Sequence, residues 1–165
     1  MIVLTIEAID LNSVLEHVTA PECGAEVLFV GTTRQFTSRA APSEDAETRT
    51  LETEFLTYEA YHEMATHQLE QLANKAKHRW PVQRVAIVHR LGKVLPQEAS
   101  VAVAVSCPHR SEAFEAAKWL IDTIKHDVPI WKQEHYVQNG PEWIHPTSGS
   151  CRCDSPDPTI AQQQQ

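Results

Sequence analysis

The order of apolar and polar residues at the start of the chain predicts a strand, a short helix and a second strand. Residues 2–9 are rich in β-branched side chains, and residues 11–18 repeat apolar side chains at helical spacing. Residues 25–31 (AEVLFVG) are typical of a buried strand. Asp10 or Asn12 would begin the helix, because a short polar side chain there accepts hydrogen bonds from the free N–H groups of the first turn.

Residues 32–50 have no apolar period and are rich in Thr, Ser, Ala and charge, which predicts a surface loop. Residues 51–60 are then typical of a strand. From residue 61 to 80 apolar residues recur at helical spacing, and Pro81 would stop the resulting amphipathic helix. Its apolar stripe consists of Met64, Leu69, Leu72, Ala73 and Ala76.

Residues 82–92 and 98–107 carry the strongest strand patterns of the chain. In the second run Val101, Val103 and Val105 share one face, and small alanines occupy the other. Apolar side chains on both faces are typical of a strand that is covered on both sides. We therefore expect a central strand between two layers.

Residues 111–127 predict a second long helix, with Ser111 as its N-cap, Glu112 in its first turn and Pro129 just beyond its end. The expected apolar stripe is Phe114, Ala117, Leu120, Ile121 and Ile124. Two short strand-like segments follow, at residues 130–137 and 142–144.

Strands mixed with two long helices, without any internal repeat, predict an α+β fold rather than a helical bundle or a sandwich. Residues 1–147 are expected to form one domain, because a chain of this length can bury a sizeable core. Residues 148–165 are rich in Ser, Pro, Asp and Gln, and we expect this tail to be disordered.

Composition narrows the possible locations and partners. The formal net charge of -8 disfavours a broadly basic surface for nucleic acid. The four cysteines include no CxxC pair, which favours a reducing, cytosolic setting. No apolar run approaches the length of a membrane span, and no basic segment precedes an apolar one at the start.

Five basic residues stand at the ends of predicted elements, where loops can converge on a ligand. They are Arg34, His109, Arg110, Lys125 and Lys132. The pair His109–Arg110 precedes the second long helix, whose free N–H groups favour anions. The pattern predicts an anion pocket that suits a phosphate group.

Each of these residues also has a purely structural interpretation. His109 and Arg110 could decorate a surface turn, Lys125 could oppose the negative end of a helix dipole, and Lys132 could extend past Trp131 into solvent. The residue types and positions leave these alternatives open.

Cysteines and histidines offer weaker candidates. Cys107 and His109 could form a nucleophile and base on one side of a strand, but no orienting third group is evident. Cys151 and Cys153 are separated by a single residue, which disfavours a zinc site. The nine histidines have no metal-binding spacing, so we predict neither a metal nor another cofactor.

Several segments in order resemble a known family. They are FVGTTR at residues 29–34, RWP at 79–81, HRLG at 89–92, HRSEAFEA at 109–116 and DTIKHDVPIWKQE at 122–134. Their sequence and spacing are similar to the large, catalytic subunit of molybdopterin synthase, and the likeness runs from about residue 25 to residue 143.

This resemblance implies an α/β hammerhead-like fold, in which a mixed sheet with two long helices is joined by a small antiparallel β subdomain. It also implies a sulfurtransferase. A small ubiquitin-like subunit with a C-terminal Gly-Gly thiocarboxylate would donate two sulfurs to cyclic pyranopterin monophosphate and so form the molybdopterin dithiolene. The large subunit would be a homodimer within a cytoplasmic heterotetramer.

The resemblance assigns roles by motif position. Lys125 and Lys132 match the two lysines on which catalysis depends in the family. Arg34 with its neighbours, the pair at the start of the second long helix, and the residues after Lys132 match substrate-binding positions. These positions are Thr32, Thr33, Arg34, His109, Arg110, Gln133 and Glu134.

Two other functions compete with this one. The chain could be a non-catalytic dimeric module that docks a ubiquitin-like sulfur carrier, although it retains both lysines. A phosphoesterase could use the same basic residues, but the sequence has neither a carboxylate cluster for a metal nor a Gly-rich phosphate loop.

Overall fold

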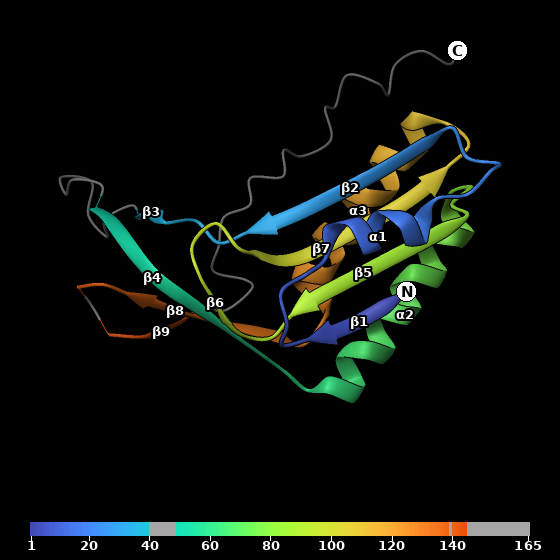
Figure 1. Cartoon of the computed structure of the whole chain (residues 1–165). Helices are drawn as coiled ribbons and strands as arrows, with labels where there is room; N and C mark the ends of the chain where they lie inside the picture. The colour runs from blue at the N-terminus through green and yellow to red at the C-terminus, as the bar shows by residue number, and fades with distance from the viewer. Residues whose placement is uncertain (40–48, 139, 145–165) are drawn as a thin grey trace, which may run out of the picture.

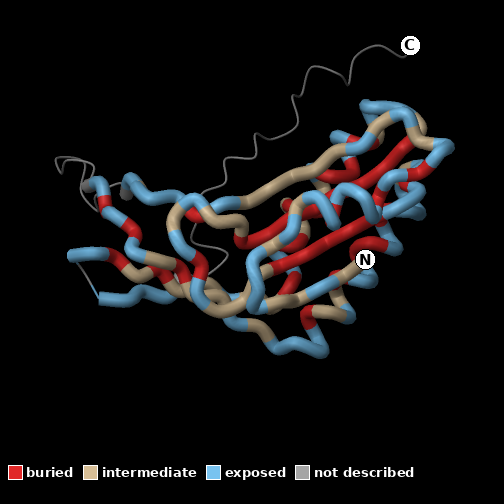
Figure 2. Tube along the Cα trace, viewed as in Figure 1, coloured by how far each residue is buried: buried red, intermediate tan, exposed pale blue. Residues whose placement is uncertain are grey.

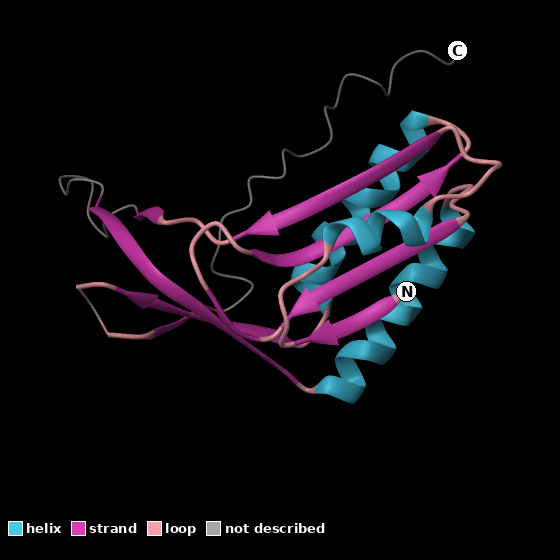
Figure 3. Cartoon of the chain, in the orientation of Figure 1, coloured by secondary structure: helices cyan, strands magenta, loops and turns pink. Residues whose placement is uncertain are grey.

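Three helices are interspersed among nine strands in the part of the chain that the computed structural model describes, residues 1–39, 49–138 and 140–144 (Figures 1 and 3). In chain order the elements are β1 (Ile2–Thr5), α1 (Leu11–Val18), β2 (Ala25–Thr32), β3 (Phe36–Arg39), β4 (Arg49–Ala60), α2 (His62–Arg79), β5 (Arg84–Arg90), β6 (Gly92–Val94), β7 (Ala99–Cys107), α3 (Arg110–Asp127), β8 (Ile130–Tyr136) and β9 (Glu142–Ile144).

The first sheet has the strand order β1-β5-β7-β2. β1 runs parallel to β5, and β7 pairs antiparallel with both β5 and β2. Figure 2 shows the buried residues concentrated along β5 and β7, at the centre of this sheet. The sheet is therefore mixed, as predicted.

Helices cover both faces of the first sheet. Val101, Val103 and Val105 pack with α2 and α3 in one apolar cluster. Ala102 and Ala104 point to the other face and pack with α1 in a second cluster. The small alanines let α1 approach the sheet closely, and the prediction of a strand covered on both sides is confirmed.

The second sheet is antiparallel, with the order β3-β4-β8-β9 and β6 paired to β4. It extends from one end of the first sheet, beyond the ends of α2 and α3 (Figure 1). β4 leads into α2, and β8 follows α3 after Pro129. The structure has the predicted α+β class with an added antiparallel subdomain.

Several local predictions were wrong. Phe36–Arg39, expected in a loop, is strand β3, because it pairs with Arg49–Glu52 of β4. His109, and not Ser111, is the N-cap of α3. Phe114 of α3 and Met64 of α2 were expected to be buried but are exposed. The buried residues of α3 are Ala113, Ala116, Ala117, Leu120, Ile121 and Ile124. Those of α2 are Ala65, Leu69, Leu72, Ala73 and Ala76.

The predicted tail, residues 148–165, lies outside the described residues, as do the domain boundary at residue 147 and the cysteines Cys151 and Cys153. Among the described residues, no helix combines the length and apolar character that crossing a membrane requires.

Candidate functional site

Arg34 follows the end of β2, where the backbone leaves its regular register. The pairing of β2 with β7 shifts between Gly31 and Thr32, and a Cβ atom on Gly31 would lie 2.7 Å from Val101 Cγ1. Glycine thus permits the close approach that precedes the bulge. The bulge turns the chain so that Thr32 and Arg34 are exposed while Thr33 is buried.

Thr33 ties this segment to the loop before β7. Its backbone N–H donates to the Glu98 carbonyl (3.1 Å), and its carbonyl accepts from Gln97 N–H (2.8 Å). The Glu98 carboxylate is itself bound by Arg90 at 2.9 Å. Arg34 is therefore an exposed cation on a backbone that the neighbouring loop holds in place.

Lys125 and Lys132 flank the turn between α3 and β8. Lys125 lies exposed in the last turn of α3, and Val128 caps the helix through its backbone N–H to the Ile124 carbonyl. Pro129 follows, and Lys132 is the third residue of β8, where it pairs with Tyr58 of β4. The two lysines therefore lie on either side of the short turn that leads from α3 into the second sheet.

Lys132 is held by a buried carboxylate. Its Nζ lies 2.7 Å from Glu134 Oε1, and the side chains are 31% and 8% exposed. The Tyr136 hydroxyl donates to the other oxygen of Glu134. The Lys132 ammonium group is therefore partly exposed to solvent while the buried carboxylate of Glu134 holds it in place. Gln133 points to the opposite side of the strand.

Tyr58 of β4 stands beside these groups. Burial raises the pKa of its phenol, a hydrogen bond with Ser100 opposes that change, and the negative charge of Glu134 adds to it. The Tyr58 ring also meets the His89 ring edge-on at 5.0 Å. The neighbourhood of Lys132 thus combines buried polar groups of both sheets.

His109 and Arg110 lie exposed at the start of α3. The turn before them is fixed by Gly24, whose N–H donates to the Pro108 carbonyl at 3.3 Å. A Cβ atom on Gly24 would lie 2.9 Å from that carbonyl oxygen, so a larger residue would displace the turn. The pair stands where the free N–H groups of α3 favour an anion.

The candidate residues form two groups at opposite ends of the first sheet. Arg110 and Lys125 are at the two ends of α3, about 22 Å apart at the usual rise of an α-helix. Arg34 follows the end of β2 beside the start of β7, whereas His109 follows the end of β7. One copy of the chain brings Arg34, Lys125 and Lys132 to one end and leaves His109 and Arg110 at the other.

The structure argues against Cys107 as a nucleophile. The side chain is fully buried, and burial raises its pKa to about 11, with smaller contributions from Cys23 and Glu112. The reactive thiolate is therefore strongly disfavoured near neutral pH. Within the described ranges, no three His, Cys, Asp or Glu side chains are grouped to hold a metal.

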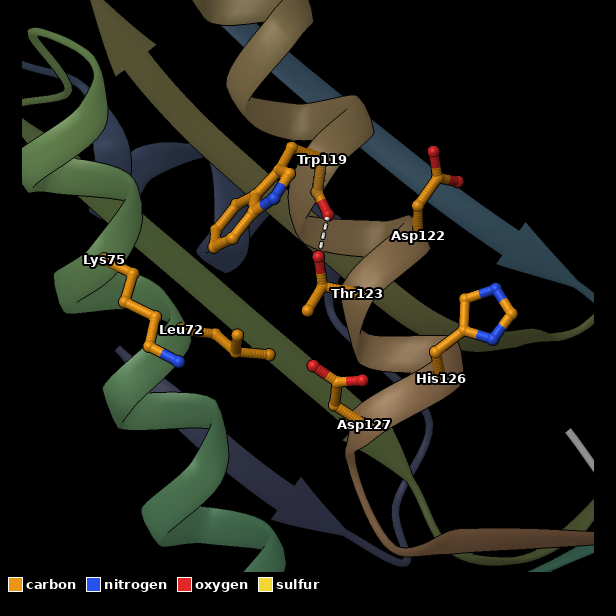
Figure 4. Close-up of a pocket in the computed structure, with 7 residues that line it drawn as sticks. All are labelled: Leu72, Lys75, Trp119, Asp122, Thr123, His126 and Asp127. Carbon is orange, nitrogen blue, oxygen red and sulfur yellow. Dashed lines mark hydrogen bonds between the residues drawn. The ribbon is translucent and has the colours of Figure 1, made fainter. Parts of the chain in front are cut away.

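A cavity of about 390 Å³ lies between α2 and α3 (Figure 4). None of the predicted site residues lines it. Thr123 donates to the Trp119 carbonyl within its wall (2.8 Å), and Asp122 on its rim pairs with Lys118 (2.7 Å). Both contacts join residues one turn apart on α3, and the cavity is widely open to solvent. The basic ends of the elements therefore remain the better candidate site.

Sequence reasoning missed Tyr136 and Tyr58. Lys132, Glu134 and Tyr136 are two residues apart along a predicted strand, so their alternation could have placed all three on one face. The position of Tyr58 opposite Lys132 depends on the register of β4 and β8, and no local pattern specifies that register.

Comparisons with known proteins agree with this fold. A family model described as "MoaE protein" matches residues 4–127. The molybdopterin synthase catalytic subunit of Halalkalibacterium halodurans is 39% identical over 138 residues, which are 84% of this chain and 81% of that protein.

Two solved structures are also similar. Molybdopterin synthase from Staphylococcus aureus has a TM-score of 0.74 at 34% identity and covers 86% of this chain and 94% of its own. A complex of subunits 1 and 2 of molybdopterin-converting factor from Helicobacter pylori has a TM-score of 0.64 at 25% identity, with 87% and 88% covered.

The fold and these matches define the class of protein as the sulfurtransferases of molybdenum cofactor biosynthesis. Within that class, the chain belongs to the MoaE family, whose curated members bear the name molybdopterin synthase catalytic subunit.

Proposed function

We propose that the chain moves two sulfurs from the thiocarboxylated C-terminus of a small ubiquitin-like subunit to cyclic pyranopterin monophosphate, forming the molybdopterin dithiolene. The observation that carries this proposal is the pair of lysines at the turn from α3 to β8, one of which is anchored by the buried Glu134. Family membership adds the class of reaction.

The two lysines suit the charges that develop in such a transfer. The acyl and phosphate oxygens need positive charge beside them, and a proton carrier is needed as the cyclic phosphate opens. In this proposal Lys132 lies nearest the incoming thiocarboxylate, and Lys125 serves the pterin side chain. Thr32, Thr33, Arg34, Gln133 and Glu134 border the same end of the sheet.

His109 and Arg110 complete the pocket from a second copy of the chain. Because α3 separates them from the lysines by about 22 Å, they cannot join Lys125 and Lys132 within one copy. A symmetric homodimer can bring the start of one α3 to the α3–β8 turn of its partner, and it does so twice. Arginine and the free N–H groups of the helix would then bind the phosphate.

The partner we infer is a small subunit docked on each copy of the dimer. The similar Helicobacter pylori structure is a complex of two different subunits, which supports such an assembly here. We infer a cytoplasmic enzyme, in keeping with the free cysteines Cys23 and Cys107. The net charge of -8 does not favour nucleic acid as a partner.

Single-turnover conversion of cyclic pyranopterin monophosphate tests the proposal. The chain is mixed with thiocarboxylated small subunit, and dithiolene is measured for wild type, Lys125→Ala and Lys132→Ala, with complex formation measured separately. Turnover by wild type and a loss of about 100-fold or more in each variant are expected. Tight complex formation without turnover by wild type would instead indicate a docking module.

A further inference from the structure

Three side chains on one face of β8 form a continuous polar row. Lys132, Glu134 and Tyr136 are two residues apart and so point to the same side of the strand. We call these three residues the β8 polar row. Its members pair across the sheet with Tyr58, Leu56 and Thr53 of β4.

Glu134 is shared between its two neighbours in the row. Oε1 accepts from the Lys132 ammonium at 2.7 Å, and Oε2 accepts from the Tyr136 hydroxyl. Exposure falls along the row, since the Lys132 side chain is 31% exposed whereas Glu134 and Tyr136 are buried. The lysine alone therefore reaches solvent, and the two buried residues stand behind it.

The hydroxyl of Tyr136 constrains how the carboxylate can turn. A carboxylate held at one oxygen can rotate about its last bond, but one held at both oxygens has a fixed plane. Tyr136 is itself fixed, because it pairs with Thr53, and the next residue donates its backbone N–H to the Glu52 carbonyl at 3.0 Å. The direction of the Lys132–Glu134 bond is thus set from the strand behind it.

We propose that Tyr136 is a positioning residue for Lys132 and acts through Glu134. The inference rests on the proposed function in one respect, that Lys132 works on the substrate. It changes the role given to Glu134 from a substrate contact to the buried link that holds the lysine in place.

Tyr136→Phe separates this role from packing, because it removes the hydroxyl and keeps the buried ring. In single-turnover sulfur transfer we expect the rate at saturating pterin to fall by about tenfold to a hundredfold, as a small displacement of a reacting group does. The pterin concentration for half-maximal rate and the binding of the small subunit should not change. Tyr61→Phe is the matched control, since Tyr61 is exposed at the start of α2.

A double-mutant cycle tests the path through Glu134. If Tyr136 acts only through that carboxylate, Tyr136→Phe should have no further effect once Glu134→Gln has removed its charge. A tyrosine that merely supports the fold would instead lower the rate by the same factor in both backgrounds. This second result would overturn the proposal.

Acylation of lysines by an amine reagent, followed by peptide mass spectrometry, gives a readout that does not depend on turnover. Loosening of the Lys132–Glu134 bond should raise the labelling rate of Lys132 by roughly tenfold in Tyr136→Phe and leave Lys125 unchanged. Equal labelling of Lys132 in wild type and variant would overturn the proposal even if wild type showed no sulfur transfer. Altered labelling with an unchanged transfer rate would overturn it as well.

Discussion

At the scale of single residues, His89 is a buried imidazole at the end of β5 whose ionisation opposes folding. One ring nitrogen, Nδ1, lies 2.9 Å from the Arg90 carbonyl, to which a neutral ring donates. Burial lowers its pKa to about 4, and the bond to Arg90 offsets only part of that effect. The folded protein therefore holds His89 neutral at pH values where an unfolded chain would protonate it.

This lowered pKa predicts a loss of stability in acid. As pH falls below about 6.5, His89 takes up a proton in the unfolded chain but not in the folded protein. The stability that depends on a neutral His89 is therefore fully present above that pH and is lost progressively down to about pH 4. The loss should reach about 3 kcal/mol. Unfolding in urea at a series of pH values measures it.

His89→Gln should remove the loss of stability in acid that arises from protonation of His89. The dependence of the unfolding free energy on pH should therefore become flatter between about 6.5 and about 4. His78→Gln, at an exposed position of α2, is the control and should retain the wild-type slope. An unchanged slope in His89→Gln would show that other groups govern the acid sensitivity.

At the scale of elements, α1 depends on a single cap. Asp10 Oδ1 accepts from the N–H groups of Asn12 at 3.0 Å and Ser13 at 3.3 Å. The helix spans only Leu11–Val18, so each bond at its start is a large part of its local stability. Val14 and Val18 then cover the alanine face of the first sheet.

Asp10→Ala should lower the free energy of unfolding by about 1 kcal/mol, because two N–H groups lose their acceptor. Asp10→Asn retains a side-chain oxygen and should stay within a few tenths of a kcal/mol of wild type. Chemical denaturation of the three proteins measures the difference. Equal losses in both variants would point to the charge of Asp10 rather than to its hydrogen bonds.

The predictability of an element follows from where its stabilising contacts lie. α2, α3, β5 and β7 could be predicted because each buries side chains in the core, and this burial leaves a repeat of apolar residues in the local sequence. β3 could not, since it is a strand only where β4 offers a partner. The buried face of α3 was also predicted incorrectly at its start. Phe114 was expected to be buried because it is the large apolar residue there, but the small alanines of that turn face the core and Phe114 is exposed.

The candidate site was predictable in its residue types and only partly in its geometry. Positive side chains at element ends indicated Arg34, Arg110, Lys125 and Lys132. That α3 holds Arg110 and Lys125 far apart could have been inferred from the predicted length of the helix. The position of the β8 polar row against β4 could not be predicted, because it depends on the register of the two strands. That register is determined by pairing between distant parts of the sequence.

At the scale of the whole molecule, the candidate residues are divided between the two ends of the first sheet. The end of α3 and the start of β8 lie where the two sheets join, and the start of α3 lies at the far end of the first sheet (Figure 1). By their positions in the chain, Lys125 and Lys132 belong to the first of these places, and His109 and Arg110 belong to the second. The proposed enzyme therefore needs two copies of the chain for each complete pocket. In a homodimer, each pocket would combine the lysines of one subunit with the His-Arg pair of the other.

Complementation between two inactive variants tests this shared pocket most directly. Lys132→Ala and Arg110→Ala are co-expressed with different affinity tags, the mixed dimers are purified through both tags, and sulfur transfer is measured with thiocarboxylated small subunit. Each variant alone should be nearly inactive. A mixed dimer has one intact pocket and one doubly impaired pocket, so it should recover about half of the wild-type activity. Mixed dimers as inactive as the single variants would contradict a pocket built from two subunits.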